Sequence, residues 1–473
     1  MRKLLIGSST LVALALVAPF ITGHISERQL TNLIATAPAP AGVKLRLESY
    51  QRGWFSSTGN VKVLLNADSA QPITLQAPFT VHHGPILIGK DFGIKIATAG
   101  ITSTLALEHP DSPVKPVIID EQAIVILKST LSLLGNLHTK LSTTAINYQQ
   151  ADGTVNWNGL QGTLDYKPAT KSLQSNLEIS PFSFASTNTP ALKVGLSGMS
   201  ISSHLQQADN GLWLGDVHVA IATLTHQQAT KPSISLEGLA FTSHLQTVGD
   251  DSEPTASYKA SAVVNKVLVN HESYGPLDME YSIDQLDQQG LVKLNSDIHA
   301  LLLSNNENVA SSYARLLQTT AMLLRHGLKI DVNNFAFKAP QGDFNLQAKL
   351  SLPPIADLLS LLGNAQQLIK QIDLTINLQA STALAKQLLQ HFTLRNIQQV
   401  AQLTDKATPE EKTTINHLVE KDSADKLQAW LNEGYVKLDN DNYSTTFMFK
   451  EGQPYLNDKR LDAPAAPVAA VAK

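Results

Sequence analysis

The residue types that most often carry chemistry show no catalytic spacing in this chain. It has 14 histidines and no cysteine, so a metal site would depend on imidazole and carboxylate ligands. No HExxH or comparable spacing occurs, and the adjacent His82 and His83 would leave opposite faces of a strand. His204 and His244 would come close only if two similar segments stack, and exposed strand histidines are the more ordinary interpretation. The sequence therefore predicts no metal and no cofactor.

Motifs for nucleophilic catalysis and nucleotide binding are also missing. There is no GxSxG elbow, no SxxK with its partner motifs, no P-loop and no GxGxxG. The carboxylate pairs Asp439/Asp441 and Glu410/Glu411 fall in a predicted turn and in the first turn of a predicted helix, where solvation and the helix dipole account for them. We expect no catalytic residues, and we expect that the protein is not an enzyme.

An aromatic pair and an arginine stand out in the segment from Tyr50 to Ser57. Arg52, Trp54 and Phe55 lie between two alternating strands, and exposed aromatics beside an arginine commonly form binding surfaces. We predict these three residues as a partner-binding group. The alternative is that Arg52 helps to form the turn while Trp54 and Phe55 tuck under the edge of the sheet.

The elements that must position this group are mainly strands. From Val43 to Leu47, apolar residues alternate with charged ones, as in a strand with one apolar and one polar face. The same period recurs near residues 61–65, 217–221, 344–350 and 372–378. The segment 196–206 is echoed at 236–246, which indicates a 40-residue strand-pair repeat. We predict an α+β fold that is predominantly antiparallel β, as an elongated twisted sheet or meander.

Helices are expected in the C-terminal half, at 308–327, 354–370, 382–403 and 408–433. The last has the most specific signal, because Thr408-Pro409-Glu410-Glu411 combines an N-cap, a first-turn proline and a capping-box glutamate. A final hairpin is expected from Tyr435 to Leu461. The long apolar stretch from Val117 to Thr143 is also interpreted as helical. Two Gly-Pro sequences, at Gly84 and Gly275, predict a break between two strands.

The N-terminus predicts a membrane anchor. Arg2 and Lys3 precede an uncharged run from Leu4 to Ser26, long enough to span a bilayer core, and the positive-inside bias then places the rest of the chain outside the cytoplasm. A cleaved signal peptide is the alternative, although the candidate cleavage sites near Ala18 and Gly23 are poor. The predicted organisation is an anchor at 1–26, a spacer at 27–42, a β-rich periplasmic region at 43–300, a mixed α/β region at 301–461 and a disordered tail at 462–473.

Composition excludes some partners. A formal net charge of −4 over 473 residues gives no basic surface for nucleic acid, and without cysteine the fold depends on packing and strand pairing rather than on disulfides. The expected location is the bacterial inner membrane, as a single-pass protein with most of the chain in the periplasm.

These features together resemble the YdgA type of bacterial inner-membrane proteins, a family with a domain of unknown function. The resemblance rests on the anchor, the segment Tyr50–Ser57 (Tyr-x-Arg-Gly-x-Phe-Ser-Ser), the turn at Gly84, the second Gly-Pro near Tyr274 and the helical section that closes at Gly434. It implies an anchored periplasmic protein that self-associates as a homodimer, with no catalytic residues to transfer. The one-sided sheets of the family also invite comparison with AsmA-like proteins, which move lipid along a hydrophobic groove.

Two functions follow as hypotheses. Because a half-apolar sheet is ordinarily sealed by other elements, the sequence favours a non-enzymatic scaffold or interaction module in envelope maintenance, with an envelope protein as its partner. The alternative is an AsmA-like carrier that binds lipid in an open apolar β-groove. Whether the helices at 308–327 and 354–370 cover the apolar face would discriminate between them.

Overall fold

The computed structural model describes residues 18–32, 34, 43–65, 73–107, 125–150, 153–186, 191–229, 231–249, 254–270, 272–303, 309–355, 365–401 and 409–461. Over these residues the chain is predominantly antiparallel β-sheet with a smaller number of helices, in agreement with the predicted class. It divides into two compact units. The first comprises Met1–Ser233, His244–Gln246 and Gln288–Met322, and the second comprises Ile234–Ser243, Thr247–Asp287 and Leu323–Lys473.

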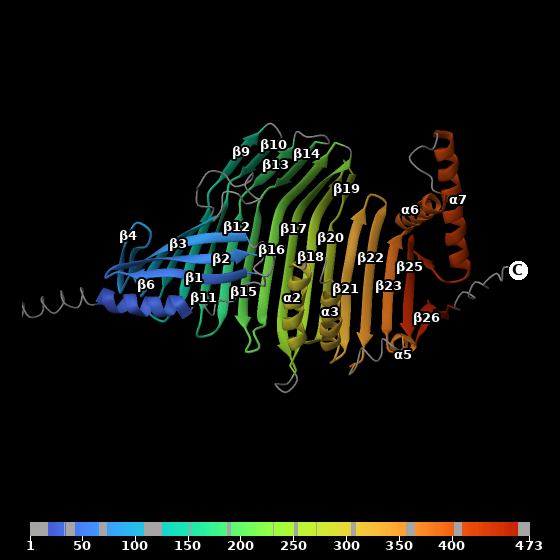
Figure 1. Ribbon diagram of the computed structural model, residues 1–473. Helices are drawn as coiled ribbons and strands as arrows, with labels where there is room; N and C mark the ends of the chain where they lie inside the picture. The colour runs from blue at the N-terminus through green and yellow to red at the C-terminus, as the bar shows by residue number, and fades with distance from the viewer. Residues whose placement is uncertain are drawn as a thin grey trace, which may run out of the picture. The chain divides into compact units, whose positions relative to one another are not determined.

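The strands of the first unit form an antiparallel meander (Figure 1). One row pairs in the order β1-β2-β3-β6-β7-β8-β11-β12-β15-β16, and a second row, β9-β10-β13-β14, also ends on β16. The bounds are β1 (Val43–Arg52), β2 (Ser56–Leu65), β3 (Ile73–His83), β4 (Ile86–Gly89), β5 (Gly93–Ile96), β6 (Ala99–Leu107), β7 (Val125–Leu131), β8 (Leu137–Thr143), β9 (Ile146–Gln150), β10 (Gly153–Trp157), β11 (Leu160–Lys167), β12 (Ser172–Ile179), β13 (Phe182–Ser186), β14 (Leu192–Leu196), β15 (Met199–Gln207) and β16 (Trp213–Gln228).

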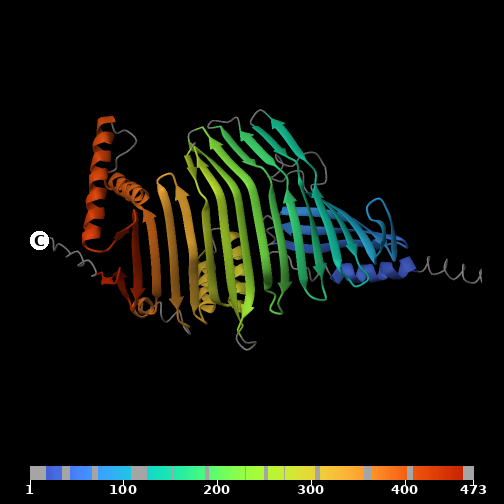
Figure 2. The same cartoon turned by 180° about the vertical axis from the view of Figure 1, so that it is seen from behind.

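The second unit is a further antiparallel meander, best followed from behind (Figure 2). Its strands pair in the order β18-β20-β21-β22-β23-β25-β26-β27. The bounds are β18 (Thr255–Val269), β19 (Glu272–Tyr274), β20 (Leu277–Asp287), β21 (Leu328–Ala339), β22 (Gly342–Leu352), β23 (Asp373–Ser381), β24 (Lys437–Asp439), β25 (Asn442–Lys450), β26 (Gln453–Leu456) and β27 (Lys459–Arg460). The remaining strand, β17 (Lys231–Val248), has residues in both units.

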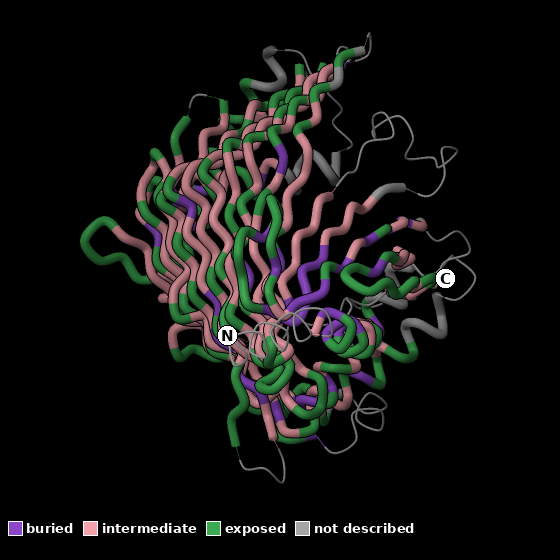
Figure 3. The backbone as a smooth tube through the Cα atoms, turned by 90° about the vertical axis from the view of Figure 1, so that its left-hand side faces the viewer, coloured by how far each residue is buried: buried purple, intermediate pink, exposed green. Residues whose placement is uncertain are grey.

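The predicted alternation is confirmed along the strands. In β1, Val43, Leu45 and Leu47 are half-buried, whereas the charged residues between them are exposed. Exposed and half-buried residues alternate in the same way over much of the molecule, and fully buried residues are few (Figure 3). The strand period in the sequence therefore predicts correctly which side chains share a face.

Three of the predicted helices are found near their expected positions. They are α3 (Val309–Leu323), α6 (Thr382–Ala401) and α7 (Pro409–Asn432), and α7 begins at the predicted first-turn proline. The fourth is represented by α5 (Ala365–Lys370), because residues 356–364 lie outside the described part of the chain. Gly327 and Gly434 follow α3 and α7 in positive-φ conformations that favour glycine, as expected for helix ends.

Other expectations need correction. The stretch from Val117 to Thr143 is not helical where it is described: it contains β7 and β8, which pair around a turn at Gly135, and residues 117–124 lie outside the description. Cross-strand pairing with β6 and β11 overrides the apolar run. The predicted β-rich region to residue 300 also contains the helix α2 (Gln288–Leu303), whose Asp297 accepts a hydrogen bond from Thr319 of α3.

The N-terminal region differs from the predicted anchor and spacer. Residues 18–32 form a helix that lies on the sheet of the first unit, so residues 27–32 are not a spacer; residues 35–42 lie outside the description. Leu30 packs against a buried core that includes Phe79, Val81 and Leu131. Among the described helices, none combines the length and apolarity needed to cross a membrane. Residues 1–17, the first part of the predicted anchor, and the tail 462–473 are outside the described residues.

The 40-residue similarity has a structural counterpart in its glycines. Gly198 and Gly238 occupy equivalent positions and both have positive φ, 106° and 64° respectively. The first copy leads from β14 into β15 through this glycine, whereas the second copy remains within β17. The repeat therefore preserves a local backbone conformation but not the strand boundaries around it.

Candidate functional site

The predicted group at the β1–β2 turn is built jointly by the turn and the N-terminal helix. Arg52 donates a hydrogen bond to Glu27 at 2.8 Å and lies 2.6 Å from Nδ1 of His24. Its guanidinium also lies 5.7 Å from the centre of the Phe20 ring. The arginine therefore holds the helix beside the turn through an ion pair, a polar contact and a cation–π contact.

Trp54 and Phe55 do not tuck under the sheet. Their exposed fractions are 50% and 56%, and the Trp54 ring lies 4.9 Å from that of Phe20. Trp54 of the turn and Phe20 of the helix thus share one surface, and Phe55 is exposed beside Trp54 in the chain. The geometry leaves this surface accessible, and its binding role remains a prediction.

The segment Tyr50–Ser57 and the strand that ends before the Gly84-Pro85 turn meet at a buried pair, Ser57 and His83. Ser57 Oγ lies 2.7 Å from Nε2 of His83, and Nδ1 of His83 lies 3.0 Å from the backbone oxygen of Trp54. Since that backbone oxygen can only accept, the network requires the proton on Nδ1, and Nε2 then accepts from the serine hydroxyl. The backbone N–H of His83 also donates to the Phe55 carbonyl at 2.9 Å.

A hydroxyl hydrogen-bonded to an imidazole is an arrangement that can activate a nucleophile. Here Ser57 is 1% exposed and His83 is 6% exposed. Gly23 of the N-terminal helix covers the imidazole so closely that a Cβ at that position would lie 2.5 Å from ring atoms. The pair therefore locks β2, β3 and the helix together, with no access for a substrate. Nearby, burial raises the pKa of the Tyr50 hydroxyl, with smaller opposing contributions from Ser57 and Arg52.

Of the other candidate histidines, His82 and His204 are exposed strand residues and His244 is a half-buried one. His82 leaves the opposite face from His83 and makes an edge contact with Phe92, as expected for adjacent strand residues. His204 pairs in register with Asp216, which also lies 2.7 Å from His244. Across the described residues, no three His, Asp or Glu side chains are grouped as a metal site would require.

A row of half-buried apolar side chains in the second unit lies on one face of β21, β22, β23 and β25. The strand register places Leu346 opposite Leu378, and Ile376 between Ala348 and Phe447. Aromatic rings gather at one end, where Phe337 and Phe344 stack at 5.0 Å. On this face of these four strands, no Phe, Leu or Ile is fully buried. We call it the apolar face of the second unit.

Within the described part of the chain, helices contact one end of that face, and residues 356–364 lie outside the description. α6 contacts β22, β23 and β25, and α7 packs against α6. Between these helices and the strands lies a cavity of about 200 Å³, lined mainly by apolar side chains that include Leu378, Leu388 and Trp430. α5 lies beside the β25–β26 turn, where Lys370 approaches Gly452. Of the two predicted helices at 308–327 and 354–370, the described part of the second, α5, is therefore at the edge of the sheet rather than on its apolar face; residues 356–364 lie outside the description.

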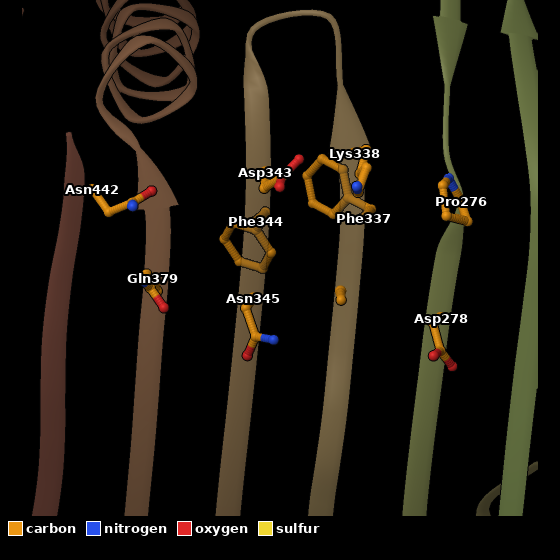
Figure 4. A pocket seen from close by; sticks show the side chains of 10 residues that line it. Pro276, Asp278, Phe337, Lys338, Asp343, Phe344, Asn345, Gln379 and Asn442 are labelled. Carbon is orange, nitrogen blue, oxygen red and sulfur yellow. The ribbon is translucent and has the colours of Figure 1, made fainter. Parts of the chain in front are cut away.

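A groove of about 410 Å³ lies across β20, β21, β22 and β23, lined by polar side chains and also by Phe337 and Phe344 (Figure 4). Asp278, Lys338, Asp343 and Gln379 come from successive strands and are exposed. Their spacing is that of ordinary cross-strand neighbours. The groove assigns no chemistry.

Comparison with known proteins gives one match. A family described as a bacterial protein of unknown function, DUF945, matches residues 1–464. No curated protein and no protein of solved structure is detectably similar to the chain.

Proposed function

We propose that this chain, which belongs to the bacterial DUF945 family, is a membrane-anchored envelope protein that holds lipid acyl chains against the apolar face of its second unit. The observation that carries the proposal is the incomplete covering of that face. In the first unit, the helix 18–32 helps to bury Phe79, Val81 and Leu131. In the second unit, the corresponding large apolar side chains of β21, β22, β23 and β25 are only half-buried.

Leaving such a face in water is unfavourable. Full burial of a Leu, Ile or Phe side chain is worth roughly 1.5–3 kcal/mol, so each half-buried side chain forgoes about 0.5–1 kcal/mol. A ligand of flexible hydrocarbon would recover this energy along the whole row without needing specific hydrogen bonds. The apolar cavity beneath α6 and α7 provides a closed end for such a row. The exposed polar residues on the other face suit contact with water.

The anchor and the periplasmic location belong to the same proposal. They are supported by Arg2 and Lys3 before a long uncharged run, and by the resemblance of the Tyr50–Ser57 and Gly84-Pro85 segments to the YdgA type of inner-membrane proteins. For a protein anchored in a membrane, lipid is the apolar ligand closest at hand for this face.

A scaffold remains the second candidate, and one observation favours it. α6 and α7 already cover part of the apolar face with protein, so a partner protein or a second copy of the chain could cover the remainder. Such a partner would bury the same side chains but would leave no lipid bound.

In-cell photocrosslinking tests the two candidates. A photoreactive benzoyl-phenylalanine is placed in the full chain at Ile376, on the apolar face, and in a matched variant at Gln347, which is exposed on the opposite face. After irradiation and proteolysis, mass spectrometry identifies the adducts. Phospholipid adducts at Ile376 alone are the expected result. Protein adducts at Ile376 would favour the scaffold, and equal lipid adducts at both positions would refute a lipid-binding face.

A further inference from the structure

The N-terminal helix has its side chains arranged opposite to those of an ordinary amphipathic helix on a soluble domain. Over its first two turns the inner face is small and polar, before Leu30 joins the core: Thr22 donates to the Gly84 carbonyl at 2.7 Å, Ser26 contacts the Thr98 carbonyl at 3.4 Å, and Gly23 lies against His83. Its outer face carries the large apolar side chains. These are Phe20, Ile21 and Ile25, all exposed. A helix in water would place these residues inward.

The β4–β5 hairpin repeats this arrangement. Ile86 pairs with Ile96 and Ile88 pairs with Ile94, so four isoleucines occupy one face of the hairpin. Their exposed fractions run from 57% to 81%. The opposite face of the hairpin is packed against the protein, because Leu87 is buried with Phe92 and Ala97. The isoleucine face is therefore not part of the core of the first unit.

Two turns bring further apolar side chains to the same end of the first unit. Trp54 and Phe55 stand at the β1–β2 turn, with Trp54 against Phe20. Leu133 and Leu134 are exposed at the β7–β8 turn. Hydrogen bonds tie these segments together: Thr98, which follows the hairpin, donates to the Ser132 carbonyl at 3.1 Å and receives the contact from Ser26 of the helix. In Figures 1 and 2 the hairpin and the N-terminal helix lie at the same end of these strands but on opposite sides of them: Phe92 of the hairpin contacts His82, whereas Gly23 of the helix lies against His83.

We infer that these four segments, which flank one end of the sheet from both of its faces, form a membrane-contact surface by which that end enters the periplasmic side of the bilayer. We call it the apolar rim: the outer face of helix 18–32, the β1–β2 turn, the isoleucine face of the hairpin and the β7–β8 turn. The inference rests on the anchoring in the proposed function and is independent of lipid binding by the second unit.

The position of the uncharged N-terminal run identifies the bilayer as the occupant. Residues from Pro19 onward lie on the sheet, which leaves Leu4 to Ala18 for the membrane. That length would span about 22 Å as a helix. The hydrocarbon core is about 30 Å thick, so roughly 8 Å is missing. Apolar faces at membrane surfaces typically enter by about 5–10 Å, which matches the shortfall.

The composition of the rim also fits a bilayer surface. Tryptophan is enriched at membrane interfaces, and Trp54 stands at the centre of the contact with Phe20. Arg28, Lys90 and Lys95 are exposed on the helix and the hairpin, where they can meet anionic headgroups. Rim and anchor together would hold the first unit directly on the membrane rather than at the end of a free spacer.

The absence of cysteine gives a direct test in the full chain. Ile88→Cys, in the rim, and Gln174→Cys, on an exposed polar site of β12, each provide a single attachment point for an environment-sensitive fluorophore. The labelled chains are reconstituted in vesicles of phosphatidylethanolamine and phosphatidylglycerol. Quenching is measured with iodide in water and with lipids carrying a nitroxide near the top of the acyl chain.

At position 88 we expect iodide quenching to fall about fivefold relative to position 174, and lipid nitroxides to quench only position 88. Equal iodide quenching at both positions would overturn the inference. Protection from iodide without lipid quenching would overturn it too, because it would mean that protein covers the rim. Failure of the chain to float with the vesicles would refute the anchoring and with it the rim, whereas lipid adducts at Ile376 would be unaffected by any of these results.

Discussion

Replacing Ser57 by alanine tests whether the buried Ser57–His83 hydrogen bond stabilises the packing of β2 against β3 in the first unit. The substitution removes the hydroxyl that lies 2.7 Å from Nε2 of His83, in a place where neither group reaches water. The imidazole nitrogen is then left without that partner, which costs about 1–3 kcal/mol. For a folding unit of this size, 1 kcal/mol lowers the Tm by about 2–4 °C, so a loss of about 2 kcal/mol lowers it by about 4–8 °C.

The matched control is Ser56→Ala, because Ser56 is exposed on the opposite face of the same strand. Its effect on the free energy of unfolding should stay within about 0.5 kcal/mol. Thermal unfolding by circular dichroism gives the stability of each variant, and hydrogen exchange over residues 79–85 shows whether the change is local. Equal Tm values and equal exchange for the two variants would refute the assigned role of the serine–histidine pair.

Three further predictions follow. Ile376→Asp should reduce the phospholipid that co-purifies with the chain about tenfold, whereas Gln347→Asp on the other face should leave it unchanged; lipid mass spectrometry would contradict the apolar face if both variants kept their lipid. Gly23→Val should displace the N-terminal helix, because the new side chain meets the imidazole beneath it, and normal exchange protection over 18–32 would argue against that packing. The Lys128 ammonium lowers the pKa of the Asp91 carboxyl in the folded protein. The pair therefore stabilises the hairpin at pH values above the pKa of Asp91 in the unfolded chain, and this stabilisation is lost as the pH falls through the lower pKa of the folded state. Amide exchange in β4 and β5, corrected for intrinsic rates, should therefore rise below about pH 4, and a rise of the same size in Lys128→Ala would disprove the link.

Much of the local structure follows from the sequence because its signals are short-range. Alternation with a period of two residues requires only that one face of a strand is apolar, and it correctly predicts β1, β22 and β23. The start of α7 at Pro409 follows from contacts within a single turn. The error at 117–143 has the opposite origin, because an apolar run alone cannot tell a helix from two strands when the deciding partners, β6 and β11, are distant in sequence.

The candidate sites show the same division. The sequence singled out Arg52, Trp54 and Phe55 by residue type, but not their contact with the N-terminal helix. It gave no signal for a helix that turns Thr22 and Ser26 inward, since such small polar residues make no apolar stripe.

By itself, the sequence determined the strand faces, the main helix positions, the lack of catalytic motifs and the two segments that resemble a known family. Only the tertiary structure decided that these segments meet at Ser57 and His83, that the apolar side chains of β22 and β23 stay half-buried where the chain is described, apart from the buried Ala380, and that Phe20 of the N-terminal helix lies against Trp54. The physical reason is the separation along the chain over which each interaction acts. Side-chain period and capping act over a few residues, whereas the bond from Thr22 to Gly84 joins positions 62 residues apart, and such a contact exists only once the chain has folded.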